Sequence, residues 1–119
     1  MPVPAELVRH LRVGTREQVA GARSRSHLGD GRAVGWYGPR GTVIDAELAC
    51  EPVPSALASR YGPVDFWGRW TRAECAAKLA GVPFPIWLRE HGLVEPAEIE
   101  LHTIRLGDTI VSIGRRGSL

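Results

Sequence analysis

The chain has 119 residues, a length typical of one folded domain and too short for two separate hydrophobic cores. Hydrophobic residues make up 44% of it and charged residues 24%, which is ordinary for a globular protein, and no apolar run approaches the roughly 20 residues that span a membrane. The net charge of +2 permits nucleic-acid binding without requiring it. We therefore expect one domain over 1–119 with no membrane contact.

The N-terminal stretch has no apolar core of a secretory signal, because Arg9, His10 and Arg12 interrupt it. A cytoplasmic location is the expectation that follows. Cys50 and Cys75 form no closely spaced pair, and in that compartment we expect both thiols to be reduced.

Two helices are predicted at the N-terminal end. Residues 4–12 place Leu7 and Leu11 on one helical face. Residues 15–18, Thr-Arg-Glu-Gln, have the form of a capping box, in which the first and last side chains bond each other's backbone N–H. A second helix over about 16–26 is expected to follow.

A β-hairpin is predicted next. Residues 33–37 and 42–48 are its strands, and Gly-Pro-Arg-Gly at 38–41 is its turn. In the second strand Ile44 and Ala46 alternate with charged residues, which indicates one buried and one mostly wet face.

Residues 50–69 carry three prolines and two glycines, so they are predicted to be a connector with a helical turn near 55–60. A second capping-box pattern at 71–74 precedes an Ala-rich run. It predicts a helix over 72–80, which Gly81 would end.

Pro85 suits the first turn of another short helix, 85–91. The last segment alternates apolar and polar residues, which predicts a second hairpin with strands at 98–106 and 109–114 around Gly107-Asp108. The fold class expected from all these elements is α+β.

Residues 71–93 have the spacing of a helix-turn-helix. Ala77 is a small residue where a second helix would cross, and Gly81, four positions later, permits a left-handed turn. Val82 and Trp87 are apolar where such a motif packs its two helices together.

With the following hairpin as a wing, residues 71–116 resemble winged helix-turn-helix DNA-binding proteins. The resemblance implies a small regulator or accessory factor that binds double-stranded DNA and places helix 85–91 in the major groove. Arginine suits both guanine edges and phosphates. The residues expected at DNA are Arg89 and His91 for the bases, and Arg69, Arg72, Lys78, Arg105, Arg115 and Arg116 for the phosphates.

Tryptophan use points to another function class. Four tryptophans are many for this length, and large aromatic side chains often anchor interfaces. An interaction or assembly module would use them to contact a second copy of the chain or another protein. The four are Trp36, Trp67, Trp70 and Trp87.

A small enzyme is the third hypothesis. Asp45 and Glu47 project from the same face of one strand, and paired carboxyls with different pKa values can act as acid and base. His102 would approach them if the two hairpins share a sheet, which would complete a carboxylate–histidine site. No metal site or cofactor is predicted, since the histidines and cysteines lack the spacing of metal ligands.

Overall fold

A computed structural model describes residues 4–117 of the chain. The fold class is α+β, as predicted, with two three-stranded antiparallel sheets. No helix in the described range is both long and apolar enough to cross a membrane. In chain order the elements are α1 (Pro4–Val8), β1 (Leu11–Thr15), β2 (Ser24–His27), β3 (Arg32–Trp36), β4 (Thr42–Leu48), α2 (Ser55–Tyr61), α3 (Phe66–Ala80), α4 (Phe84–His91), β5 (Ile99–Leu106) and β6 (Thr109–Arg116).

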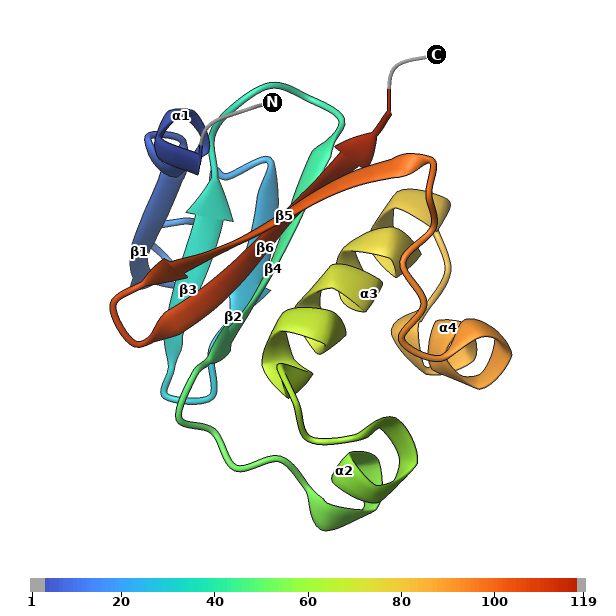
Figure 1. Cartoon of the computed structure of the whole chain (residues 1–119). Coiled ribbons are helices and arrows are strands. Elements are labelled where there is room, and N and C mark those ends of the chain that lie inside the picture. Colours follow the sequence, from blue (N-terminus) through green and yellow to red (C-terminus); the bar gives the residue numbers. More distant parts are fainter. Residues whose placement is uncertain (1–3, 118–119) are drawn as a thin grey trace.

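The two sheets form adjacent layers (Figure 1). The first sheet has the strand order β1-β3-β2, and the second has the order β4-β6-β5. Apolar side chains from both sheets meet in one cluster, in which Val34 and Trp36 of β3 face Ile44 of β4 and Ile113 of β6. Burial of these side chains is the main force that holds the sheets together.

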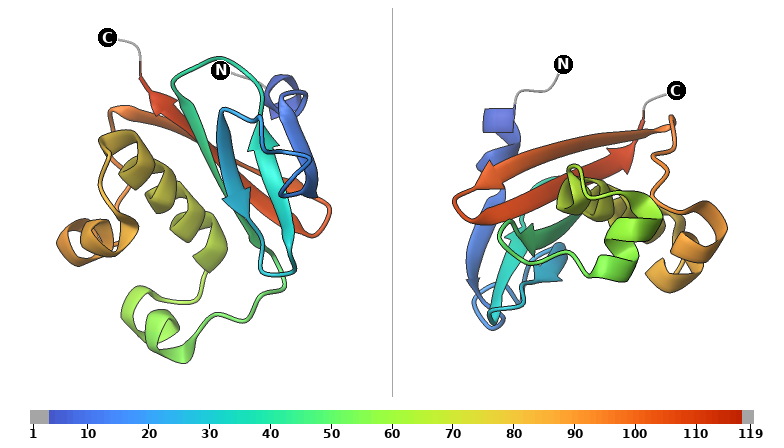
Figure 2. Two further views of the ribbon diagram at one scale, coloured as in Figure 1. Left: turned by 180° about the vertical axis from the view of Figure 1, so that it is seen from behind. Right: turned by 60° about the horizontal axis from the view of Figure 1, so that its bottom comes forward.

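Helix α3 covers the other face of the second sheet, so that this sheet lies between α3 and the first sheet (Figure 2). Ala73, Ala76 and Ala77 are fully or almost fully buried, and their small side chains let helices and strands approach closely. Trp87 of α4 packs on these alanines and anchors the short helix to the longer one.

Serine side chains join the two sheets at their shared edge. The Oγ atoms of Ser24 and Ser26 on β2 accept hydrogen bonds from the backbone N–H groups of Ile44 (3.0 Å) and Ala46 (2.9 Å) on β4. These hydroxyls replace the carbonyls that a neighbouring strand would supply, so the edge of β4 keeps no unpaired N–H at these positions.

The predicted hairpin of residues 33–37 and 42–48 does not form. Both strands exist, but β3 pairs with β1 and β2, whereas β4 pairs with β6. The turn between them lets the chain pass from one sheet to the other.

The first predicted N-terminal helix forms but is shorter than expected, and the second prediction is wrong. The first stops at Val8, and residues 11–15 become a strand because their backbone pairs with β3. The capping box does form, with Thr15 N–H bonded to Gln18 Oε1 at 2.8 Å and Gln18 N–H bonded to Thr15 Oγ1 at 3.1 Å. Only turns follow it, and β2 replaces the end of the second predicted helix.

Helix 85–91 and the C-terminal hairpin are confirmed within a residue or two. The helix predicted at 72–80 begins earlier, at Phe66, and Thr71 lies inside it rather than at its cap. The hairpin is not a free wing, because β6 is the central strand of the second sheet and has β4 on its other side.

Candidate functional site

Three acidic side chains come together where α3 crosses β4. Asp45 and Glu47 are two residues apart on β4 and therefore share the strand face that looks toward α3. Glu74 and Lys78 are four residues apart on α3, one turn from each other. These four side chains line a polar pocket of about 290 Å³, and β2 closes it with Arg25, Ser26 and His27.

Asp45 lies at the bottom of this acidic pocket and is only 5% exposed. Its Oδ1 atom accepts a hydrogen bond from the Ser26 hydroxyl at 3.2 Å and contacts Lys78 Nζ at 3.4 Å. Its Oδ2 atom is buried and has no hydrogen-bond partner among the described residues. The carboxyl of Glu74 lines the same pocket, and we call Asp45 and Glu74 the carboxyl pair.

Burial is the largest cause that raises the pKa of Asp45, and the negative charge of Glu74 adds to it. Burial also raises the pKa of Glu74, against the opposing effect of the Lys78 ammonium. The pKa of Glu47 is raised to about 7, first by burial and then by the charges of Glu74 and Glu51. Near neutral pH, Glu47 is therefore divided between its ionised and neutral forms.

Lys78 is held in place by the backbone around it. Its Nζ atom donates to the carbonyl oxygens of Ile44 at 2.7 Å and Arg25 at 3.4 Å. The ammonium group therefore stands at a fixed position beside Asp45, where it stabilises a negative charge on the carboxyl pair.

His102 does not join this site, although the two predicted hairpins do share a sheet. In the second sheet His102 lies opposite Ile113, which lies opposite Ile44, so all three face the core between the sheets. Asp45 is one residue further along β4 and faces α3 instead. The predicted carboxylate–histidine site is therefore wrong, and the missing partners of Asp45 are Glu74 and Lys78.

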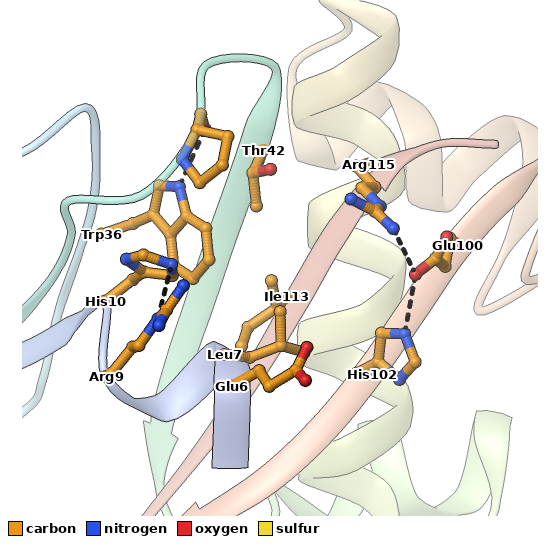
Figure 3. Close-up of a pocket in the computed structure, with 11 residues that line it drawn as sticks. Glu6, Leu7, Arg9, His10, Trp36, Thr42, Glu100, His102, Ile113 and Arg115 are labelled. Atoms are coloured by element: carbon orange, nitrogen blue, oxygen red, sulfur yellow. Dashed lines mark hydrogen bonds and ion pairs between the residues drawn. The ribbon is translucent and has the colours of Figure 1, made fainter. Parts of the chain in front are cut away.

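The His102 side chain lines a different cavity, of about 180 Å³, beneath α1 (Figure 3). Its Nε2 atom is 3.0 Å from Glu100 Oε2, and Arg115 contacts the same oxygen at 3.1 Å. The opposite wall carries His10 and Trp36, whose ring centroids are 5.1 Å apart. The two bonds hold the pKa of Glu100 below its usual value, so this carboxylate stays charged and paired.

All six basic residues expected at DNA phosphates have partners within the protein. Arg72 bonds Glu95 at 2.9 Å and Asp65 at 3.1 Å. On α4, Arg89 is exposed, and the ring of His91 lies 4.3 Å from the ring of Trp87. The remaining phosphate candidates bond carbonyl or carboxylate oxygens: Arg69 bonds Tyr61 and Gly62, Lys78 bonds Ile44, Arg105 bonds Gly107, Arg115 bonds Glu100, and Arg116 bonds Leu79.

The tryptophans are parts of the interior rather than an exposed contact surface. Trp36 and Trp87 are 1% and 7% exposed. Trp67 and Trp70 are partly buried and belong to one aromatic group, in which Trp70 stacks on Phe66 and Trp67 contacts both rings edge-on.

Comparison with protein-family models, with curated proteins and with solved structures found no match to this chain. Within residues 4–117, no group of three His, Cys, Asp or Glu side chains is placed to hold a metal ion. Both cysteines are free thiols, with Cys50 exposed and Cys75 buried.

Sequence reasoning identified Asp45 and Glu47 but not their partners. Glu74 and Lys78 carried a usable signal, because they lie four residues apart on a predicted helix that also contains four alanines. When the alanine face of such a helix packs on a strand, the charged side chains beside that face need polar partners on the strand.

Proposed function

We propose that this protein is a small enzyme that performs acid–base catalysis in the acidic pocket. The meeting of three carboxyls, Asp45, Glu47 and Glu74, in one polar pocket beside Lys78 is the observation that carries this proposal. Burial raises the pKa of all three, and that of Glu47 to about 7, so neutral and ionised carboxyls can act together as proton donor and acceptor near neutral pH. Carboxyl groups with such perturbed pKa values are common at functional sites.

The roles follow from burial and position. Glu47 is partly buried and lines the pocket, so its ionised form acts as the base toward a bound substrate. Glu74 acts as the proton donor, because burial raises its pKa and its side chain, less buried than that of Asp45, also lines the pocket. Asp45, Ser26 and Lys78 stabilise the negative charge that remains after the proton leaves.

The substrate class follows from the pocket wall. Its lining is almost entirely polar, with hydroxyl, carboxyl, imidazole and cationic groups within reach. A small polar molecule with hydroxyl or amino groups suits such a wall, because each of its polar groups finds a hydrogen-bond partner. The proposed reaction class is proton transfer to and from that molecule.

An NMR screen tests the proposal. Isotope-labelled protein is mixed with small sugars, polyols, amino acids and polyamines, and compounds that shift the signals of Ser26, His27 and Glu47 are assayed for turnover. Glu47→Gln is expected to keep the fold and abolish turnover. Glu90→Gln, at an exposed position of α4, is the control and is expected to leave turnover unchanged. The proposal fails when none of these compounds shifts the pocket signals, or when Glu47→Gln turns over the substrate as the wild type does.

DNA binding is the second candidate, and the turn between α3 and α4 favours it. Gly81 has the left-handed conformation (φ 69°) that the helix-turn-helix spacing requires, and Ala77 is buried at the crossing. Arg89 is exposed on the helix that would enter the major groove. The test is fluorescence anisotropy with labelled random duplex DNA across a salt series, for the wild type, Arg89→Ala and the control Arg40→Ala. Binding that weakens steeply with salt and depends on Arg89 supports this candidate, and no binding at low salt removes it.

A further inference from the structure

Positive charge is concentrated in the part of the chain that forms β1 and β2. Residues 9–29 contain five arginines and one acidic residue, Glu17, so their net charge is +4, whereas the whole chain carries +2. The rest of the chain is therefore net negative. Such an uneven distribution of charge over a small domain favours an anionic partner at its basic end.

The register of the first sheet places two of these arginines on one face. Arg12 of β1 and Arg25 of β2 both lie opposite Gly35 of β3, so the three residues form a row across the sheet. Val34 and Trp36 belong to the cluster between the sheets, and side chains alternate along a strand. Arg12 and Arg25 therefore project from the outer face of the first sheet, away from the second sheet (Figure 2).

The segment that joins β1 to β2 adds two more arginines. It folds over the outer face at Gly35, where a Cβ atom would lie 2.8 Å from the side chain of Ala22 and 3.0 Å from that of Val19. Val19 is fully buried beneath the segment. Arg16 and Arg23 lie at the two ends of the segment and are exposed.

The four arginines on this face have no anionic partner in the protein. Among residues 4–117, no carboxylate pairs with any of their guanidinium groups, and Arg25 donates only to the carbonyl of Ala20, at 3.2 Å. Arg32 of β3, by contrast, pairs with both Asp30 and Asp108. Phosphate groups would supply the four arginines with the charged acceptors that the protein does not provide.

An aromatic ring lies among these arginines. Tyr37 follows β3 on the same face as Gly35 and is 41% exposed. The Arg12 guanidinium lies over its ring at 5.6 Å from the centroid, and the Tyr37 hydroxyl donates to the Gln18 carbonyl at 3.3 Å. Unpaired bases stack on aromatic rings and guanidinium planes, whereas the bases of a duplex are already stacked on each other. The ring therefore favours a single strand over a duplex or an acidic peptide.

The residues of this basic surface are Arg12, Arg16, Arg23, Arg25 and Tyr37. We propose that the basic surface binds single-stranded nucleic acid, with phosphates on the arginines and a base on Arg12 and Tyr37. It does not include α4, on which the duplex-binding candidate depends, and it is independent of the proposed acid–base function.

Fluorescence anisotropy tests the proposal. The probes are labelled oligo(dT) and oligo(U) of about 12 nucleotides, within the range of known single-strand sites, and a duplex of the same length. Both single strands are expected to bind more tightly than the duplex, because only they leave bases free to stack. Four phosphate contacts predict that log affinity falls with log salt concentration with a slope of about −3.

Three variants separate charge from stacking. Arg12→Gln combined with Arg25→Gln removes two phosphate contacts and is expected to halve the slope. Arg60→Gln combined with Arg105→Gln is the control, because it removes the same charge at exposed positions outside the basic surface and should keep the slope. Tyr37→Leu keeps every charge and is expected to keep the slope but to weaken single-strand binding about tenfold.

Three results overturn the proposal. The first is the absence of single-strand binding at low salt. The second is binding that Arg89→Ala abolishes and the Arg12/Arg25 double variant does not, since this would assign the nucleic acid to α4. The third is equal affinity of Tyr37→Leu and the wild type, which would show that the surface recognises charge alone. The arginine variants change only exposed positions, so they test the proposal even where Tyr37→Leu fails to fold.

Discussion

Replacing Glu47 with glutamine should remove a pH-dependent loss of stability. The pKa of Glu47 is raised from its usual 4.5 to about 7 in the folded protein. The folded chain therefore binds this proton more tightly than the unfolded chain does, and the free energy of unfolding falls as pH rises from about 4.5 to about 7. At about 1.4 kcal/mol per pKa unit, the rise from 4.5 to about 7 sets an upper limit of about 3.5 kcal/mol. Because Glu47 is only partly buried, solvent screening reduces the expected loss to about 1–2 kcal/mol.

The measurement is urea unfolding at about pH 5 and about pH 8, followed by tryptophan fluorescence. Glu47→Gln should match the wild type at the lower pH and exceed its stability at the higher pH. Asp45 and Glu74 contribute a residual pH dependence of the same sign, since their pKa values are also raised. Glu90→Gln controls for the loss of one surface charge. A Glu47→Gln variant that keeps the full pH dependence of the wild type would refute the assignment of that dependence to the acidic pocket.

Three further predictions concern the fold. Ser26→Ala leaves the buried N–H of Ala46 unpaired and should lower the free energy of unfolding by about 1–3 kcal/mol in urea titrations, whereas a change near zero would mean that this hydroxyl does not join the sheets. Gly81→Ala should lower the free energy of unfolding by about 1–2 kcal/mol in the same assay, because alanine is strained at a φ of 69°. No atom lies within 4 Å of the added carbon, so the cost comes from the backbone alone, and a neutral result would contradict the left-handed turn. In the native protein a thiol reagent should modify Cys50 rapidly and Cys75 only on unfolding, since Cys75 is buried and burial raises its pKa. Rapid labelling of both cysteines would show that α3 separates readily from the sheet.

The elements that sequence predicted correctly are those with a strong local pattern. Strand 42–48 alternates apolar and charged residues, and the C-terminal hairpin turns at Gly107, which has a positive φ of 59°. Helix 85–91 has a proline in its first turn and Gly92 at its end. These signals act over a few residues, so they predict the element without knowledge of the rest of the chain.

The partners of the strands could not be predicted in the same way. Nothing local distinguishes a hairpin of 33–37 with 42–48 from two strands that belong to different sheets. Residues 11 and 12 were likewise predicted to end a helix, yet they begin a strand because β3 offers its backbone hydrogen bonds.

The candidate site shows the same division. Sequence alone determined that Asp45 and Glu47 share one face of a strand, because side chains alternate along any strand. Only the tertiary structure decided which groups meet that face. The register of the second sheet directs His102 to the opposite side, and the packing of α3 brings Glu74 and Lys78 to Asp45. The raised pKa values of these carboxyls depend on burial and on proximity between residues far apart in the chain, and both are properties of the folded protein.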